Sequence, residues 1–139
     1  MSTTTTTSND VIRARKAQST ITASGAIGAN QAGEELNVAT DALVITLPKI
    51  ESSLLGMEYT VRNTGADGNN KLVVSPDDSN KIVGGMTQAA AVFHASGVLG
   101  KDLINTKATS KLGDWVELRA VSLTEYYIVG GQGIWASEA

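Results

Sequence analysis

His94 is the only histidine in the chain, and there is no cysteine. Hydrolysis by a catalytic triad needs a base that titrates near neutral pH beside a nucleophile, and histidine usually fills that role. His94 lies in the alanine-rich stretch 87–96 and has no acid adjacent in the sequence. A surface or packed histidine is the favoured interpretation, so we predict no catalytic residue and no enzyme activity. Without cysteine, disulfides and thiolate metal sites are excluded.

Two acid-rich segments contain residue types that bind calcium, at residues 67–70 (DGNN) and 77–80 (DDSN). Both lack the alternating ligands and the distal glutamate of a calcium loop. Asp, Asn, Ser and Gly are also the usual turn-forming residues. We therefore predict turns at both segments, with no metal site and no bound cofactor.

Two glycine pairs, Gly84-Gly85 and Gly130-Gly131, are candidates for close approach to a phosphate. Neither pair belongs to a GxxxxGK[ST] loop or to a GxGxxG segment that opens a helix after a strand. Glycines within strand patterns more often mark β-bulges, tight bends or close backbone approach. We predict those roles for both pairs and for Gly133.

Four large aromatic residues, Trp115, Tyr126, Tyr127 and Trp135, lie in the last quarter of the chain. Side chains of this kind either fill a core or anchor a contact with another molecule. The residues after Trp115 alternate as in an extended strand. One face is apolar (Val116, Leu118 and Ala120), and the other is mixed (Trp115, Glu117, Arg119 and Val121). The mixed face is typical of a contact surface.

Arg13, Arg15 and Lys16 form a short basic segment in a chain of net charge −3. Residues 34–139 carry eight bases against thirteen acids, so the rest of the chain is mildly acidic. Three charges on a tail fall short of the clustered basic surface that binds nucleic acid, so no nucleic-acid partner is expected. The segment either contacts an acidic protein surface or is a solvated tail.

The elements that must position these residues begin after a long polar segment. Residues 2–8 read STTTTTS, and glycines punctuate the sequence at 25, 28 and 33. Such a segment buries too little apolar surface to fold alone. We predict an extended, partly disordered N-terminal arm over residues 1–35 and a β-sandwich body over residues 36–139.

From Leu36 onward, short extended runs alternate with turn residues, which is typical of an all-β fold. Strands are predicted near residues 42–47, 57–63, 71–75 and 81–85, with a C-terminal pair from 115. Residues 87–96 contain three consecutive alanines, which favour a helix, but the flanking strands favour another strand. About seven or eight strands are expected, in an antiparallel β-sandwich or a jelly-roll-like barrel.

Size and composition favour association. The 139 residues include only six aromatic ones, and a core of short side chains buries modest area. Burial against a partner would add stability, so a homo-oligomer is expected. No run of about 18 apolar residues is present, and no secretory signal is recognisable, so no membrane partner is expected.

The segments LINTKATSKLGDWVEL (103–118) and YYIVGGQGIWA (126–136) resemble the closing part of head decoration, or cement, proteins of tailed bacteriophages. The upstream segments ITLP (45–48) and YTVRNTGADGNNKLVVSPDDSNKIVGG (59–85) are similar in order and character. The resemblance covers residues 36–136 and carries no catalytic motif. Related β-modules occur in phage tail fibres and baseplates.

The resemblance implies a virion protein made in the host cytoplasm, commonly a homotrimer, that sits on the capsid surface. There it would bridge neighbouring major capsid proteins and stabilise the capsid. Arg13, Arg15 and Lys16 would contact the capsid or a neighbouring subunit, and the C-terminal aromatics would anchor the trimer or the body. The alternative is a tail-fibre or baseplate module that binds a receptor or glycan through Trp115, Tyr126 and Tyr127.

Overall fold

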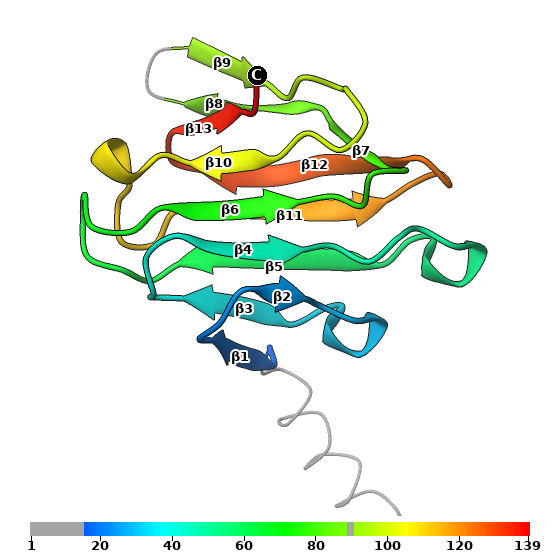
Figure 1. The fold of residues 1–139 in the computed structure, drawn as a ribbon, viewed down its shortest axis with the longest axis horizontal. Coiled ribbons are helices and arrows are strands. Elements are labelled where there is room, and N and C mark those ends of the chain that lie inside the picture. The colour runs from blue at the N-terminus through cyan, green and yellow to red at the C-terminus, as the bar shows by residue number, and fades with distance from the viewer. Residues whose placement is uncertain (1–15, 89–90) are drawn as a thin grey trace, which may run out of the picture.

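The computed structural model describes residues 16–88 and 91–139, which form an all-β sandwich (Figure 1). A six-stranded sheet, called sheet A, packs against a five-stranded sheet, called sheet B, and a two-stranded hairpin lies at one end. The predicted all-β sandwich is confirmed. The strands are β1 (Gln18–Ile21), β2 (Gly25–Ala26), β3 (Glu35–Val38), β4 (Leu43–Thr46), β5 (Glu58–Asn63), β6 (Leu72–Ser75), β7 (Lys81–Val83), β8 (Gly85–Gln88), β9 (Ala91–His94), β10 (Leu103–Asn105), β11 (Trp115–Ala120), β12 (Glu125–Gln132) and β13 (Trp135–Ser137), with short 3-10 helices η1 (Ala29–Gln31), η2 (Ser52–Leu54) and η3 (Lys107–Thr109).

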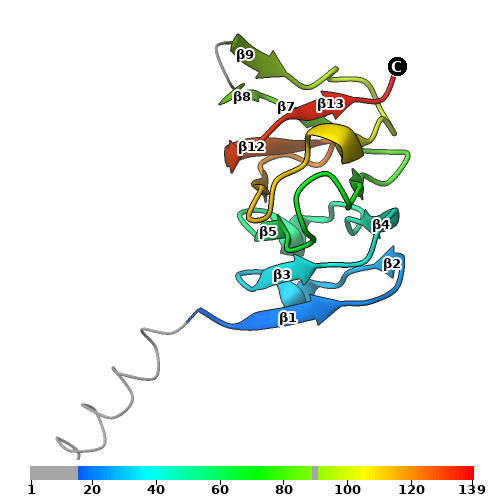
Figure 2. The same cartoon turned by 90° about the vertical axis from the view of Figure 1, so that its left-hand side faces the viewer.

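The first seven strands alternate between the two layers of the sandwich (Figure 2). Sheet A has the order β1-β3-β5-β11-β12-β7, and sheet B has the order β13-β10-β6-β4-β2. The odd strands β1, β3 and β5 are parallel neighbours in sheet A, and the even strands β2, β4 and β6 are parallel neighbours in sheet B. The N-terminal half therefore winds around the core.

The antiparallel pairing expected for the sandwich describes only part of it, because both sheets are mixed. The four pairs within the N-terminal winding are parallel, as is the pair of β7 with β12. The turns at residues 67–70 and 77–80 do not join neighbouring strands of one sheet. Each joins one sheet to the other, since β5 and β7 lie in sheet A and β6 lies in sheet B.

The sandwich also begins earlier than predicted and contains more strands. β1 pairs with β3, and β2 pairs with β4, so residues from 18 onward belong to the two sheets. This moves the boundary expected at residue 35 toward the N-terminus, and the expected arm over residues 1–15 lies outside the described residues. The described residues form thirteen strands rather than seven or eight, and within the segment 87–96 residues 87–88 and 91–94 lie in β8 and β9.

The core lies between the sheets and consists of the faces predicted from alternation. Leu43, Ile45 and Leu47 are buried, whereas the intervening Val44 and Thr46 are partly exposed. On β11 the apolar face is likewise fully buried, at Val116, Leu118 and Ala120. Burying such side chains stabilises the fold by about 1.5–3 kcal/mol for each larger one.

A network of buried amides crosses the core near one end of the strands. Asn63, Asn70 and Asn105 are at most 1 % exposed. Asn63 donates from Nδ2 to Asn105 Oδ1 (2.7 Å), and Asn70 donates from Nδ2 to Asn63 Oδ1 (2.8 Å). Asn105 in turn donates from Nδ2 to Asp114 Oδ2 (3.1 Å). The network joins β5, β10 and two loops, so it links the two sheets through polar contacts.

The glycine pairs lie at irregular or crowded places, as predicted. The pairing of β11 with β12 shifts register between Glu117 and Leu118, opposite Gly130, which marks a β-bulge. A Cβ at Gly131 would lie 2.7 Å from Met86 Sδ and 3.1 Å from the carbonyl oxygen of Trp115, so the position is crowded.

The acid-rich segments form turns, as predicted. The backbone N–H of Ser79 donates to Asp77 Oδ1 (2.9 Å), which is local turn chemistry, and this bond lowers the pKa of Asp77. Asp67 Oδ1 accepts from the N–H of Leu112 (2.7 Å) and so ties its turn to the segment before β11.

Candidate contact surfaces

Trp115 lies on the outward face of sheet A and is partly exposed. Its ring packs over the neighbouring strand, because a Cβ added at Gly130 would lie 3.1 Å from Trp115 Cη2. The guanidinium carbon of Arg62 lies 5.9 Å from the ring centroid, within the range of a cation–π contact. Trp115 is therefore held in a defined orientation with part of its surface available.

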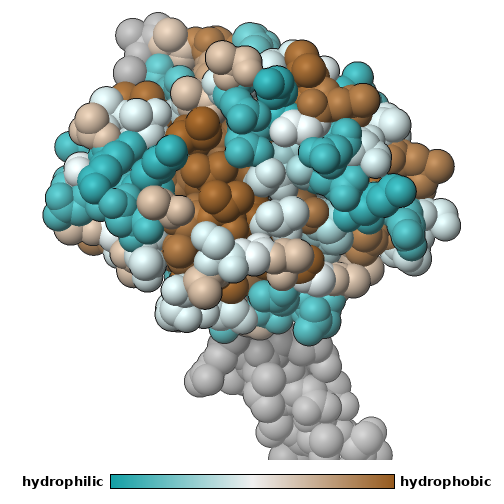
Figure 3. Space-filling view, in the orientation of Figure 1, coloured by the Kyte–Doolittle hydropathy of each residue, from teal (hydrophilic) through white to brown (hydrophobic). Residues whose placement is uncertain are grey.

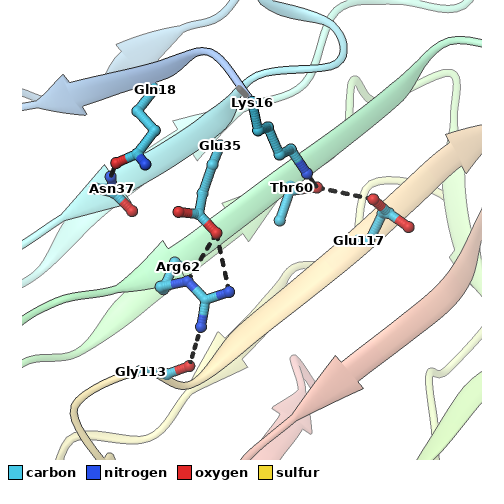
Figure 4. A network of polar contacts seen from close by, with 8 residues as sticks. All are labelled: Lys16, Gln18, Glu35, Asn37, Thr60, Arg62, Gly113 and Glu117. Carbon is cyan, nitrogen blue, oxygen red and sulfur yellow. Dashed lines mark hydrogen bonds and ion pairs between the residues drawn. The ribbon is translucent and has the colours of Figure 1, made fainter. Parts of the chain in front are cut away.

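Arg62 connects three elements on the same face (Figure 4). It donates from Nε to Glu35 Oε1 (2.9 Å) on β3 and from Nη1 to the carbonyl of Gly113 (2.8 Å), before β11. The second contact to Glu35 Oε1, from Nη2, is also 2.9 Å. This pair is partly shielded from solvent, so it orients the guanidinium beside Trp115 more firmly than an exposed pair would.

Lys16 belongs to a second chain of polar contacts on this face (Figure 4). Its ammonium donates to Thr60 Oγ1 (3.2 Å), and the Thr60 hydroxyl donates to Glu117 Oε2 (2.9 Å). The Thr60 hydroxyl on β5 thus links a base that precedes β1 to an acid on β11. Of the three predicted basic contacts, Lys16 is engaged within its own chain, whereas Arg13 and Arg15 lie outside the described residues.

Apolar side chains follow the other half of the outward face of sheet A. Tyr127 is 45 % exposed and Val129, two residues along β12, is 38 % exposed. Val83 is the cross-strand neighbour of Tyr127 on β7, and Val121 follows β11 at 39 % exposure. We call these four residues the Tyr127 strip. A polar margin lies beside it, where Arg119 donates from Nε to Glu58 Oε2 (2.9 Å).

The outward face of sheet B carries a second apolar surface. Val44, Val73 and Ile104 lie side by side in register on β4, β6 and β10, and Ala136 follows on β13. We call these four residues the aliphatic row. Figure 3 shows apolar side chains gathered over this face of the molecule. Val73 is only 5 % exposed but lies outside the core cluster, and Val44, Ile104 and Ala136 are partly exposed.

Trp135 and Tyr126 belong to the core rather than to a surface. Trp135 is 2 % exposed, and its indole N–H donates to the carbonyl of Gln132 (3.0 Å). Tyr126 is fully buried, and its hydroxyl donates to the carbonyl of Pro48 (2.6 Å). Burial raises the pKa of Tyr126 far above its usual range. Of the two roles left open by the sequence, these two aromatics anchor the body, and only Trp115 and Tyr127 reach the surface.

The residues considered for catalysis are not brought together. His94 lies exposed on β9. Over residues 16–88 and 91–139 we find neither a surface pocket nor a group of three histidine or acidic side chains placed to hold a metal ion. No helix in the same ranges is long and apolar enough to span a bilayer.

The aliphatic row is the surface that sequence reasoning missed. Three of its four residues sit in the runs LVIT, LVVS and LIN, where apolar residues are consecutive rather than alternating. Consecutive apolar residues place apolar side chains on both faces of a strand. That signal distinguishes these strands from β11, whose outward face alternates with charged residues.

Comparison with known proteins adds no relative: no protein-family model matches the chain, and no curated protein matches it.

Proposed function

We propose that this chain is a structural virion protein of a tailed bacteriophage that binds the outside of the capsid and bridges neighbouring major capsid proteins. The observation that carries the proposal is that both outward faces of the sandwich bear aligned apolar side chains. Soluble monomers rarely expose contiguous apolar surface without a partner to cover it. The resemblance of residues 36–136 to head decoration proteins supports the choice of a phage capsid as the partner.

The two surfaces differ in a way that suits two kinds of contact. The aliphatic row contains only Val, Ile and Ala, and homo-oligomer interfaces are the more apolar class. We assign the aliphatic row to contacts between subunits of a homotrimer. The Tyr127 strip combines an exposed aromatic with the Arg119–Glu58 pair, as in interfaces with a different protein, and we assign it to the capsid.

The mechanism in this proposal is bridging by shape and apolar contact. Each trimer would present several Tyr127 strips, and simultaneous engagement of neighbouring capsid subunits raises avidity without any new kind of contact. Arg13 and Arg15 would add charge contacts to an acidic neighbour. Any ordering of their segment on binding would cost entropy that offsets part of that gain.

Capsid binding by the Tyr127→Ser variant tests this assignment. A buried interface aromatic contributes more than about 1 kcal/mol, so the affinity for capsids of the phage that encodes the chain should fall about tenfold. Co-sedimentation of the protein with purified capsids measures it. Val92, which is 63 % exposed on β9, gives the matched control Val92→Ser with unchanged binding. Equal binding by both variants would remove the strip from the mechanism.

Electron microscopy of virions tests the function itself. Density for the sandwich on the capsid surface at local symmetry axes is the expected result. Density confined to the tail or baseplate would contradict a decoration role.

A second candidate function, glycan or receptor binding by a phage tail module, is favoured by the setting of Trp115. A partly exposed indole beside Arg62 and Glu117 is the kind of aromatic platform with polar neighbours that stacks on a sugar ring. Glycan-array binding by the free protein, lost on Trp115→Ala and kept on Tyr127→Ser, would favour this function over capsid decoration.

A further inference from the structure

The two ends of the sandwich differ in whether the outward backbone groups of their edge strands have hydrogen-bond partners. At the end formed by β7 and β13, the chain itself covers the edges. The N–H of Ala95 donates to the carbonyl of Gly84 (2.9 Å), and the N–H of Gly100 donates to the carbonyl of Asn80 (2.9 Å). The segment 95–100 therefore bonds to the backbone immediately before and immediately after β7.

The side chain of Gln88 covers the outer edge of β13. Gln88 accepts from the N–H of Trp135 at Oε1 (2.7 Å) and donates from Nε2 to the carbonyl of Trp135 (3.2 Å). An amide side chain thus makes the same pair of hydrogen bonds that a neighbouring strand would make. In addition, the Ser137 hydroxyl accepts from the N–H of Ser96 (2.9 Å).

The opposite end of sheet A is open along β1 in the described part of the chain. The N–H of Glu35 on β3 donates to the carbonyl of Ala17 (2.9 Å). Because backbone groups alternate in direction along a strand, the N–H and C=O groups of Gln18 and Thr20 point away from β3. Within residues 16–88 and 91–139 no group bonds to them.

The composition of β1 lacks the devices that usually protect an edge. Its sequence, QSTI, has no charge and no proline, and β1 carries no bulge in its pairing with β3. Two charged side chains lie near β1, and neither extends along its edge: Lys16 reaches over the sheet face to Thr60, and the Glu34 carboxylate accepts from the Ser19 hydroxyl. An unprotected edge of this kind is a template for one more strand.

We propose that the open edge of β1 accepts residues 2–8 (STTTTTS) of a second copy of this chain as an added strand. The segment is uncharged, lacks proline and is rich in β-branched threonine, which favours strands. The fifteen residues before the described part of the chain join it directly at β1, so every copy carries the segment close to such an edge. The proposal concerns self-association and does not depend on capsid binding.

The residues between the segment and β1 favour a second copy, rather than the same chain, as the source of the added strand. Residues 9–17 separate the segment from β1 and contain neither glycine nor proline. Hairpin loops usually span two to five residues, so a nine-residue loop that returns residues 2–8 to β1 of the same chain is disfavoured. A tight turn at Asn9-Asp10 would place residues 2–8 against residues 11–17 and leave the edge of β1 open.

Amide hydrogen exchange in full-length variants tests the proposal. In the unaltered protein the amides of Gln18 and Thr20 should exchange at least about tenfold more slowly than in Thr5→Pro, which removes strand character from the donor segment. Thr20→Pro should block the acceptor edge while leaving the ladder to β3 intact, because the lost N–H points outward. Thr20→Val, which keeps that N–H, is its matched control and should behave as the unaltered protein. Slow exchange of β11 and β12 amides reports folding in each variant.

Mixing two variants distinguishes strand addition by a second copy from strand addition within one chain. Isotopically labelled Thr5→Pro has an intact edge but no donor, and unlabelled Thr20→Pro has an intact donor but no edge. Mixing them should restore slow exchange at Gln18 and Thr20 of the labelled chain. Fast exchange of these amides in the unaltered protein would overturn the proposal, and so would slow exchange that mixing fails to restore.

Discussion

At the scale of single residues, the buried aromatics stabilise the fold with their polar ends as well as with their rings. The hydroxyl of Tyr59 donates to the carbonyl of Gly28 (3.3 Å), and that of Tyr126 donates to the carbonyl of Pro48 (2.6 Å). Each bond fastens a loop to the core from a strand of sheet A. Burial raises the pKa of both tyrosines above the ordinary value of 10.0.

The raised pKa of Tyr126 predicts a loss of stability in alkali. The neutral hydroxyl is favoured in the folded protein, whereas the unfolded chain ionises near the ordinary value of 10.0. The contribution of this group is therefore complete below that value and declines as pH rises through it and above. Tyr126→Phe should lose about 1 kcal/mol at neutral pH with the hydrogen bond, yet should depend less on pH above about 10.

Urea unfolding of both proteins across this pH range measures the effect. Tyr127→Phe, at a residue 45 % exposed, is the control and should keep the pH dependence of the unaltered chain. Parallel alkaline curves for Tyr126→Phe and the unaltered protein would contradict the assignment.

At the scale of elements, alternation along the sequence predicts which way side chains face but not which strands pair. The buried faces of β4 and β11 follow directly from the positions of Leu43, Ile45 and Val116. The parallel pairing of β1 with β3 depends on a connection through sheet B, and no local pattern encodes it. The β2 strand has only Gly25 and Ala26, too short a pattern to predict.

The candidate surfaces were predictable to a similar extent. The mixed face with Trp115 was predicted from alternation, whereas the burial of Trp135 and Tyr126 depends on tertiary contacts. Trp135 is held by Gln88, which lies 47 residues away in the sequence. Tyr126 reaches a carbonyl that is 78 residues away. Contacts over such separations cannot be deduced from local spacing.

The buried amide network makes a prediction about the joining of the two sheets. Asn105→Ala should remove the acceptor for Asn63 and the donor to Asp114, and should destabilise the protein by about 1–3 kcal/mol for each buried group left without a partner. Chemical denaturation measures this loss. Asn69→Ala, at an exposed turn position, should change stability by less than about 0.5 kcal/mol. Equal stability of the two variants would show that the network contributes nothing.

At the scale of the whole molecule, the covered edges limit how copies can associate. Gln88→Ala should leave the N–H and C=O of Trp135 without their side-chain partner at the edge of β13. An uncovered edge promotes pairing between molecules, so light scattering should show larger, concentration-dependent assemblies than the unaltered chain forms. Gln132→Ala, the same change at an exposed position, should form assemblies of the same size as the unaltered chain. Larger assemblies in both variants would indicate a cause other than the β13 edge.

The position of β11 in sheet A has a consequence for synthesis of the protein. β11 lies between β5 and β12 in the sheet, although it is among the last strands to leave the ribosome. Until residues 115–120 emerge, β5 has no partner on one side, and the winding of β1 to β6 presents an unfinished sheet. Domains generally fold as units during translation, so this one must wait until most of its length has been made. A messenger truncated before β11 would therefore yield an incomplete sheet prone to aggregation rather than a smaller working protein.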